Sequence, residues 1–171
     1  MAPLLRRSWA PSGHTPLIHH RTRHFQKVSV IAALCVSPTR DRVFCYFRLH
    51  PGRSITSLEV RGFLRQLLRQ LDAPMVLIWD RLSAHRSRVV QSALLQTTPQ
   101  ISPWFLPSYA PELNPVEYLW SYMKMNPLAN CAIDELSVLA STTRLNVRRL
   151  QHKQDLLRAF IQHSPLPLRL Y

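Results

Sequence analysis

The amino-acid sequence predicts an α/β fold, in which a mixed sheet is flanked by helices and followed by a C-terminal helical tail. Two runs rich in β-branched and aromatic residues, 27–36 and 42–50, are separated by the turn-rich segment "SPTRD". A continuous apolar run, "MVLIW" at 75–79, follows a stretch with helical spacing. From there on, predicted strands alternate with predicted helices, which is typical of a sheet with a parallel portion.

The first half of the chain predicts a β-hairpin and then a helix. The two β-rich runs form the hairpin because only a short turn joins them. Asp41 lies in that turn, where an aspartate most often hydrogen-bonds the backbone. Thr56 and Glu59 have the spacing of a capping box. The apolar residues after them recur at helical spacing, at Val60, Phe63, Leu64, Leu67, Leu68 and Leu71.

The apolar run that Pro74 opens and Asp80 closes has the pattern of a strand buried on both faces of a sheet. Residues 86–95 can form a helix, and "ISPWFLP" at 101–107 gives a short strand. Helical spacing returns over residues 136–150 and again in "DLLRAFIQ" near the end of the chain.

The stretch "LPSYAPELNPVEYLW", residues 106–120, leads from the second short strand into a helix. Asn114 is a good N-cap, Pro115 suits the first helical position, and Glu117 sits where a capping glutamate would. The apolar face of this helix consists of Val116, Leu119, Trp120 and Met123.

The charge balance points to a polyanionic partner. Lysine and arginine number 22 against nine acidic residues, which gives a formal charge of +13. Nucleic acid is the favoured partner, through phosphate contacts and counterion release. A membrane surface is the weaker alternative, since no stretch approaches the ~20 apolar residues of a spanning helix. The first residues do not resemble a signal peptide, so the cytoplasm is the expected compartment.

Two carboxylates are placed where chemistry could occur. Asp80 ends the apolar strand, and sites in open α/β sheets collect at the carboxyl ends of strands. A simpler explanation is that Asp80 pairs with Arg81 or Arg86, or caps the next helix. Glu117, in the first turn of the helix after the neighbouring strand, could approach the same edge of the sheet. Together the two carboxylates would suit magnesium ions bound to a phosphodiester substrate.

Two motifs resemble those of a known family. "LIWDRLSAHRS" at 77–87 and "LPSYAPELNPVEYLWSYMK" at 106–124 are similar to the second and third acidic motifs of DDE-type transposases, in the bacterial insertion-sequence branch of the mariner superfamily. "RRSWAPSGHTP" near the start resembles the loop after the family's first strand. "LAN" at 128–130 and "DLLRAF" at 155–160 resemble its C-terminal tail.

The resemblance implies an RNase H-like fold, a pair of Mg²⁺ or Mn²⁺ ions, and cleavage and joining of DNA strands at transposon ends. Asp80 matches the second catalytic acid and Glu117 the third, while Glu112 matches a common acid without a catalytic role. His85 matches a recurrent histidine that orients the loop or touches substrate. A histidine near a helix start that is satisfied by solvent is an equally simple explanation of His85.

The chain departs from the family pattern at its first catalytic aspartate. That residue ends the family's first strand, but only residues 1–5 precede the matching loop, and no acidic residue occurs before Asp41. Asp41 lies in the hairpin turn, and Asp72 precedes its strand rather than ending it. We therefore expect a truncated chain with three parts: a loop remnant at 1–26, an RNase H-like catalytic core at 27–126 and a C-terminal helical tail at 127–171.

Two consequences are expected of such a fragment of a transposase. Metal-dependent strand transfer should be lost or very weak, and the sheet, lacking its first strand, should have unpaired edges and an exposed apolar face. The alternative is a DNA-binding remnant without enzymatic activity, which would interfere with intact transposase by occupying DNA or pairing with its subunits. A third reading is that Met1 is not the true start, or that a frameshift joins this frame to an upstream one.

Overall fold

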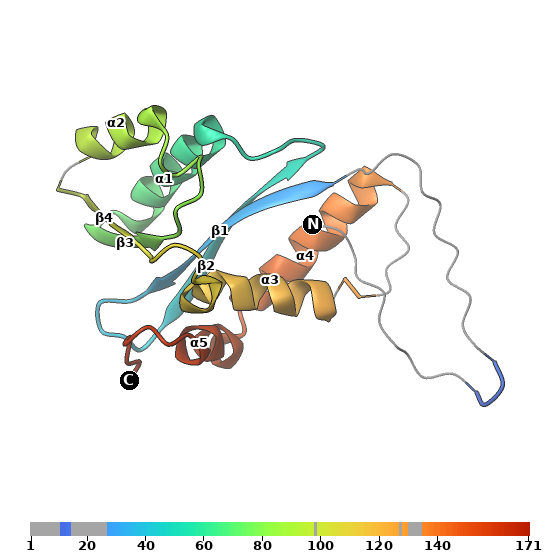
Figure 1. Ribbon diagram of the computed structural model, residues 1–171. Helices are drawn as coiled ribbons and strands as arrows, with labels where there is room; N and C mark the ends of the chain where they lie inside the picture. Colours follow the sequence, from blue (N-terminus) through green and yellow to red (C-terminus); the bar gives the residue numbers. More distant parts are fainter. Residues whose placement is uncertain (1–10, 15–26, 98, 127, 130–134) are drawn as a thin grey trace.

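The computed structural model describes residues 11–14, 27–97, 99–126, 128–129 and 135–171. The described residues form four strands, five α-helices and one short 3₁₀ helix (Figure 1). In chain order these are β1 (Val28–Val36), β2 (Val43–Pro51), α1 (Ser57–Leu71), β3 (Met75–Trp79), α2 (Arg88–Gln96), β4 (Ile101–Phe105), η1 (Pro111–Leu113), α3 (Pro115–Met125), α4 (Leu136–Gln151) and α5 (Gln154–His163). Most of the predicted loop at 1–26 lies outside the described residues.

Strands β1 and β2 form the predicted hairpin. They pair antiparallel, with Val28 opposite Pro51 at one end and Val36 opposite Val43 at the other. In the turn between them, the carboxylate of Asp41 accepts hydrogen bonds from the hydroxyls of Ser37 and Thr39. Asp41 therefore serves the turn, as the sequence predicts, but its carboxylate binds side-chain hydroxyls rather than the backbone.

Strands β3 and β4 form the parallel part of the fold. Met75 lies opposite Ile101, and Trp79 lies opposite Phe105. Helix α2 connects the two strands, and it packs on α1. The sheet is mixed in the predicted sense, because the hairpin is antiparallel and this pair is parallel.

The strands do not form one continuous sheet. In the part of the chain that the structure describes, β1 pairs only with β2, and β3 pairs only with β4. The prediction that β3 is buried on both faces is wrong, since Val76 is 66% exposed and Ile78 is 40% exposed. Alternate residues of a strand point to opposite faces. Met75, Leu77 and Trp79 pack on the helices, while no described element covers the opposite face.

The apolar side chains gather into two main clusters. Helices α1 and α2 lie on one side of the hairpin and α3 and α5 on the other (Figure 1). The first cluster, here called the hairpin core, contains Val43, Cys45, Leu119, Met123, Leu128, Val147, Leu150, Leu157, Phe160 and Ile161. The second, here called the parallel-strand core, contains Val60, Leu64, Trp79, Val90, Leu94 and Ile101. Strand β1 touches both, because Ile31 packs on the parallel-strand core and Ala32 on the hairpin core.

Local sequence signals set the helix boundaries. The capping box that begins α1 is confirmed, with both the Thr56 and the Glu59 side chains bonded to backbone N–H groups. Helix α2 begins after Ser87, whose hydroxyl accepts from the backbone N–H of Val90. It spans residues 88–96 rather than the predicted 86–95. The two C-terminal helices pack against β2 as part of the hairpin core.

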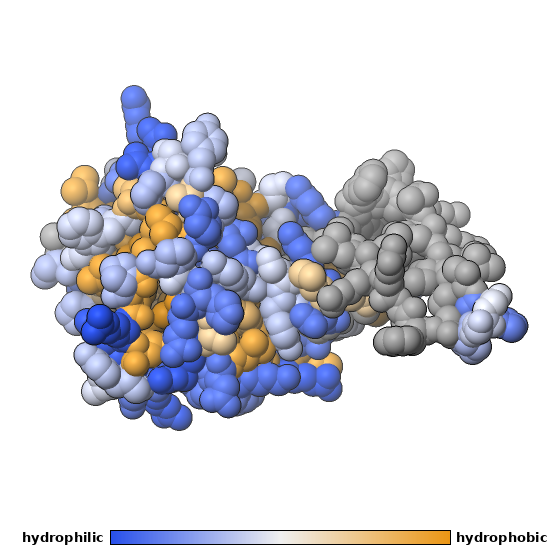
Figure 2. Space-filling model, turned by 60° about the horizontal axis from the view of Figure 1, so that its bottom comes forward, coloured by the Kyte–Doolittle hydropathy of each residue, from blue (hydrophilic) through white to orange (hydrophobic). Residues whose placement is uncertain are grey.

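Apolar side chains interrupt the hydrophilic surface in several places, including the face drawn in Figure 2. Leu95 is 77% exposed and Trp104 is 66% exposed. Among the described helices, none is long and apolar enough to cross a lipid bilayer.

Candidate active site

Asp80 directly follows β3, at the carboxyl end of the parallel pair. Its Oδ1 atom accepts a hydrogen bond from the backbone N–H of Leu82 at 2.9 Å and another from Nδ1 of His85 at 2.8 Å. These bonds, of which that from His85 acts most strongly, hold the pKa of Asp80 below its ordinary value, although partial burial opposes them. Since both bonds use Oδ1, the Oδ2 atom has no protein partner among the described residues.

His85 holds the loop after β3 in place. Its ring stacks on Trp79 with centroids 4.6 Å apart, and its carbonyl oxygen accepts from Nε2 of Gln91 at 3.0 Å. Its side chain is only 16% exposed. The expectation that Asp80 pairs with Arg81 or Arg86 is wrong, because His85 takes that position. Arg81 instead donates from Nε to the carbonyl oxygen of Leu106.

Glu117 lies in the first turn of α3, and its carboxylate does not cap the helix. Asn114 is the N-cap, as the sequence predicts, and its side chain accepts from the backbone N–H of Val116. A capping glutamate would need the N–H of Asn114, but that group donates to the carbonyl oxygen of Pro111 at 2.9 Å. Within the described part of the chain the carboxylate of Glu117 accepts no hydrogen bond, which leaves both oxygens available.

The two carboxylates face one open cleft. Burial, and then the negative charge of Asp80, raise the pKa of Glu117 above its ordinary value. The effect of Asp80 on the pKa of Glu117 shows that the two carboxylates lie near each other, as the sequence predicts. They come from different elements, since Asp80 follows β3 and Glu117 lies on α3. The cleft has a volume of about 380 Å³. Its lining consists of Asp80, Arg81, Leu82, Arg86, Pro107, Ser108, Tyr109, Ala110, Pro111, Asn114 and Glu117.

The donors in the cleft fit a hard divalent cation. Carboxylate oxygens are the ligands that Mg²⁺ and Mn²⁺ prefer, and Mg²⁺ is often held by one or two carboxylates together with substrate phosphates. Asp80 and Glu117 supply two. No group of three His, Cys, Asp or Glu side chains that could hold a metal ion occurs within the described ranges. Glu112 and Asp41 do not line the cleft.

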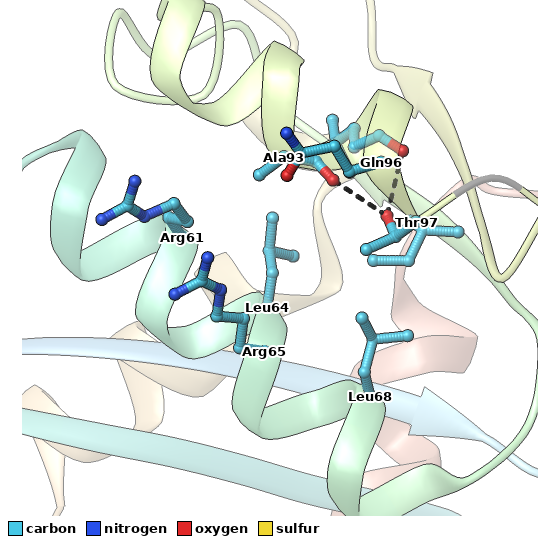
Figure 3. A pocket seen from close by; sticks show the side chains of 9 residues that line it. Arg61, Leu64, Arg65, Leu68, Ala93, Gln96 and Thr97 are labelled. Carbon is cyan, nitrogen blue, oxygen red and sulfur yellow. Dashed lines mark hydrogen bonds between the residues drawn. The ribbon is translucent and has the colours of Figure 1, made fainter.

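A second hollow, between α1 and α2, is too small for a substrate (Figure 3). Arg61 and Arg65 lie at its edge, and the hydroxyl of Thr97 is turned to the carbonyl oxygens of Ala93 and Leu94. Its volume is about 40 Å³, room for little more than a single water molecule. The cleft at Asp80 and Glu117 is therefore the better candidate for a functional site.

Sequence reasoning did not single out Tyr109, which lines the cleft. The residue stands in the quoted motif between Pro107 and Pro111, so its loop position could be read from the sequence. The sequence did not indicate that Tyr109 has a backbone φ of 59° or that the residue is fully exposed. No local rule of turn chemistry predicts an aromatic residue in the left-handed region.

Comparison with known proteins agrees with this architecture. The chain resembles the Mos1 mariner paired-end complex with Mn, with a TM-score of 0.65, 18% identity, and coverage of 96% of this chain and 48% of that chain. It also resembles the Mos1 transposase catalytic domain solved with raltegravir and Mn, with a TM-score of 0.57, 17% identity, and coverage of 81% and 77%. The chain thus has an RNase H-like fold and spans about half the length of the Mos1 chain in the paired-end complex.

Sequence comparison identifies the family. No curated protein matches the chain. The sequence profile of the DDE superfamily endonucleases matches residues 2–140, which is most of the chain. The chain therefore belongs to the DDE superfamily endonucleases.

Proposed function

We propose that Asp80 and Glu117 form two-thirds of a three-carboxylate site for DNA strand cleavage and joining, as in an insertion-sequence transposase. The observation that carries the proposal is the cleft itself, where two carboxylates from separate elements lie close enough for Asp80 to raise the pKa of Glu117. Each carboxylate has an oxygen without a hydrogen-bond partner among the described residues. Both oxygens are therefore available to a cation.

A bound Mg²⁺ or Mn²⁺ would neutralise charge on a phosphodiester and promote attack by water or a DNA hydroxyl. The residues of this chain prepare the site for it. His85 and the N–H of Leu82 fix the Oδ1 atom of Asp80, and Asp80 lines the cleft. His85 is thus proposed to orient the loop rather than to contact substrate. The cationic side chains of Arg81 and Arg86 line the same cleft, where phosphates would lie.

We propose further that the chain alone does not cleave DNA. The family resemblance requires a third carboxylate, and neither Asp41 nor Asp72 can supply it. Asp41 is engaged in the hairpin turn, and Asp72 is the C-cap of α1, at the opposite end of β3 from Asp80. Two carboxylates hold a metal pair poorly, so we expect weak Mn²⁺ binding and no strand cleavage.

The test measures Mn²⁺ binding and DNA nicking separately. Free Mn²⁺ is followed by electron paramagnetic resonance in titrations of the purified chain, of Asp80→Asn and of Glu117→Gln. Glu112→Gln is the matched control, because Glu112 is exposed and lies outside the cleft. Both site variants should lose Mn²⁺ binding and the control should retain it. Magnesium-dependent nicking of plasmid DNA by the unaltered chain, abolished in Asp80→Ala, would contradict the proposed inactivity.

A second function, DNA binding without catalysis, is favoured by the charge of +13. Such a chain would compete with an intact transposase for DNA or pair with its subunits. The double variant Asp80→Asn with Glu117→Gln separates the two functions. Inhibition of an intact transposase that survives the double variant would establish binding as the function, whereas its loss would support the metal site.

A further inference from the structure

Tyr109 has a combination of properties that the stability of the fold does not explain. Its φ of 59° places it in the left-handed region, where glycine and asparagine are favoured. Its side chain is 102% exposed relative to an extended reference, so the ring gains no burial against the rest of the chain. Residues that break a local rule without a compensating contact tend to cluster at functional sites.

The backbone around Tyr109 is restrained on both sides. Leu106 is 5% exposed, and its N–H donates to the carbonyl oxygen of Trp79 at 2.8 Å. Pro107 and Pro111 have fixed φ angles. The 3₁₀ helix η1 follows at once and leads into α3. The ring of Tyr109 is therefore carried by a short, restrained loop at the edge of the cleft that contains Asp80 and Glu117.

Two arginines line the same cleft as Tyr109. Arg81 donates from Nε to the carbonyl oxygen of Leu106, which ties it to the same loop, and its guanidinium lies 5.8 Å from the ring centroid of Phe105. Arg86 makes no ion pair with any described residue, and it also lines the cleft. An exposed aromatic ring and cationic groups on one cleft are the combination that binds single-stranded nucleic acid, in which bases stack and phosphates are neutralised.

We propose that Tyr109 is a stacking platform for an unpaired nucleobase next to the phosphate that a cation bound by Asp80 and Glu117 would hold, with Arg81 and Arg86 on neighbouring phosphates. The inference rests on the proposed function, since it takes DNA as the substrate of the cleft. The stacking inference adds that at least one base of the DNA substrate is unpaired where the DNA contacts Tyr109. A flat aromatic face stacks on any base, so the contact tolerates changes of sequence.

The test compares Tyr109→Gly with Tyr109→Phe. Fluorescence anisotropy measures the affinity for a duplex with a single-stranded 3′ extension of about four nucleotides, a typical single-strand site size, in buffer with Ca²⁺. Tyr109→Gly should bind about tenfold more weakly, which corresponds to the loss of one stacked base. Tyr109→Phe, which keeps the ring, should bind within about twofold of the unaltered chain. Trp104→Ala is the matched control, because Trp104 is an exposed aromatic outside the cleft.

Two further measurements separate stacking from a structural role. The melting temperature of Tyr109→Gly should equal or exceed that of the unaltered chain, because glycine adopts a positive φ without strain. A 2-aminopurine base in the extension should be quenched by the unaltered chain and by Tyr109→Phe, but not by Tyr109→Gly.

Full affinity of Tyr109→Gly, or an equal loss of affinity for blunt duplex, would overturn the stacking inference. If either result is obtained while Asp80→Asn still fails to bind Mn²⁺, the stacking inference is wrong but the proposed metal site is supported. If the unaltered chain binds neither the extended duplex nor Mn²⁺, both the inference and the proposed function are wrong.

Discussion

Replacement of Leu119 by alanine tests whether the hairpin core holds the helix that carries Glu117. Leu119 lies two residues after Glu117 on α3, and its side chain is 0% exposed within the hairpin core. Removal of a buried leucine side chain to alanine costs about 3–5 kcal/mol, from lost transfer free energy and from the cavity left behind. For a chain of this size, that loss lowers the melting temperature by roughly 6–20 °C, at about 2–4 °C per kcal/mol.

The assay is urea unfolding followed by circular dichroism, for the unaltered chain, Leu119→Ala and two controls. Leu119→Met conserves volume and should cost less than about 1.5 kcal/mol. Leu95→Ala alters a side chain that is 77% exposed and should change the free energy of unfolding by no more than about 0.5 kcal/mol. A cost below about 1 kcal/mol for Leu119→Ala would refute the packing of α3, since it lies well under the range for buried leucines.

Three further outcomes are expected. Thr56→Ala removes the N-cap of α1 and should lower the free energy of unfolding by about 1 kcal/mol, so an unchanged urea midpoint would argue against the capping box. Asp72→Gly should raise it, because a φ of 44° costs a residue with a side chain about 1–2 kcal/mol, more than the about 0.4–1 kcal/mol by which glycine favours the unfolded chain; a lower melting temperature would count against this. The raised pKa of Glu117 means that its contribution to stability is full at acid pH and declines as the pH rises above 4.5 through the higher folded value. Glu117→Gln should remove that decline from the melting temperature, while Mn²⁺ affinity of the unaltered chain should increase over the same pH range.

The sequence predicted the elements well because the relevant signals are local. The capping box of Thr56 and Glu59, the N-cap of Asn114 and the apolar spacing of the helices each depend on residues a few positions apart. The hairpin was predicted for the same reason. Alternation of strands and helices was then sufficient to predict a mixed α/β fold.

The sequence did not predict how the strands associate. The run 75–79 is apolar throughout, which is the pattern of a strand buried on both faces. Exposure of Val76 and Ile78 depends on which other strands lie beside β3, and periodicity within one strand carries no information about that. The pairing of β1 only with β2, and of β3 only with β4, is a property of the tertiary arrangement.

In the candidate site, the two carboxylates were predicted but their partners were not. Arg81 and Arg86 were the predicted partners of Asp80, yet His85 reaches it because the loop turns back over Trp79. Glu117 had the spacing of a capping residue. The short helix η1 uses the N–H that Glu117 would have capped, and a competition of that kind appears only in three dimensions.

Because the interior is divided into two cores, a cation shared by Asp80 and Glu117 would link two separately packed parts of the fold. Asp80 follows a strand of the parallel-strand core, whereas Glu117 is carried by a helix of the hairpin core. Cooperative unfolding units often coincide with such clusters, so we expect each core to open to a degree without the other. A cation bound by both carboxylates would join the cores as a cross-link. At a concentration one hundred times its dissociation constant, the cation would stabilise the folded state by about 2.7 kcal/mol. The free energy of unfolding would therefore rise as the site fills.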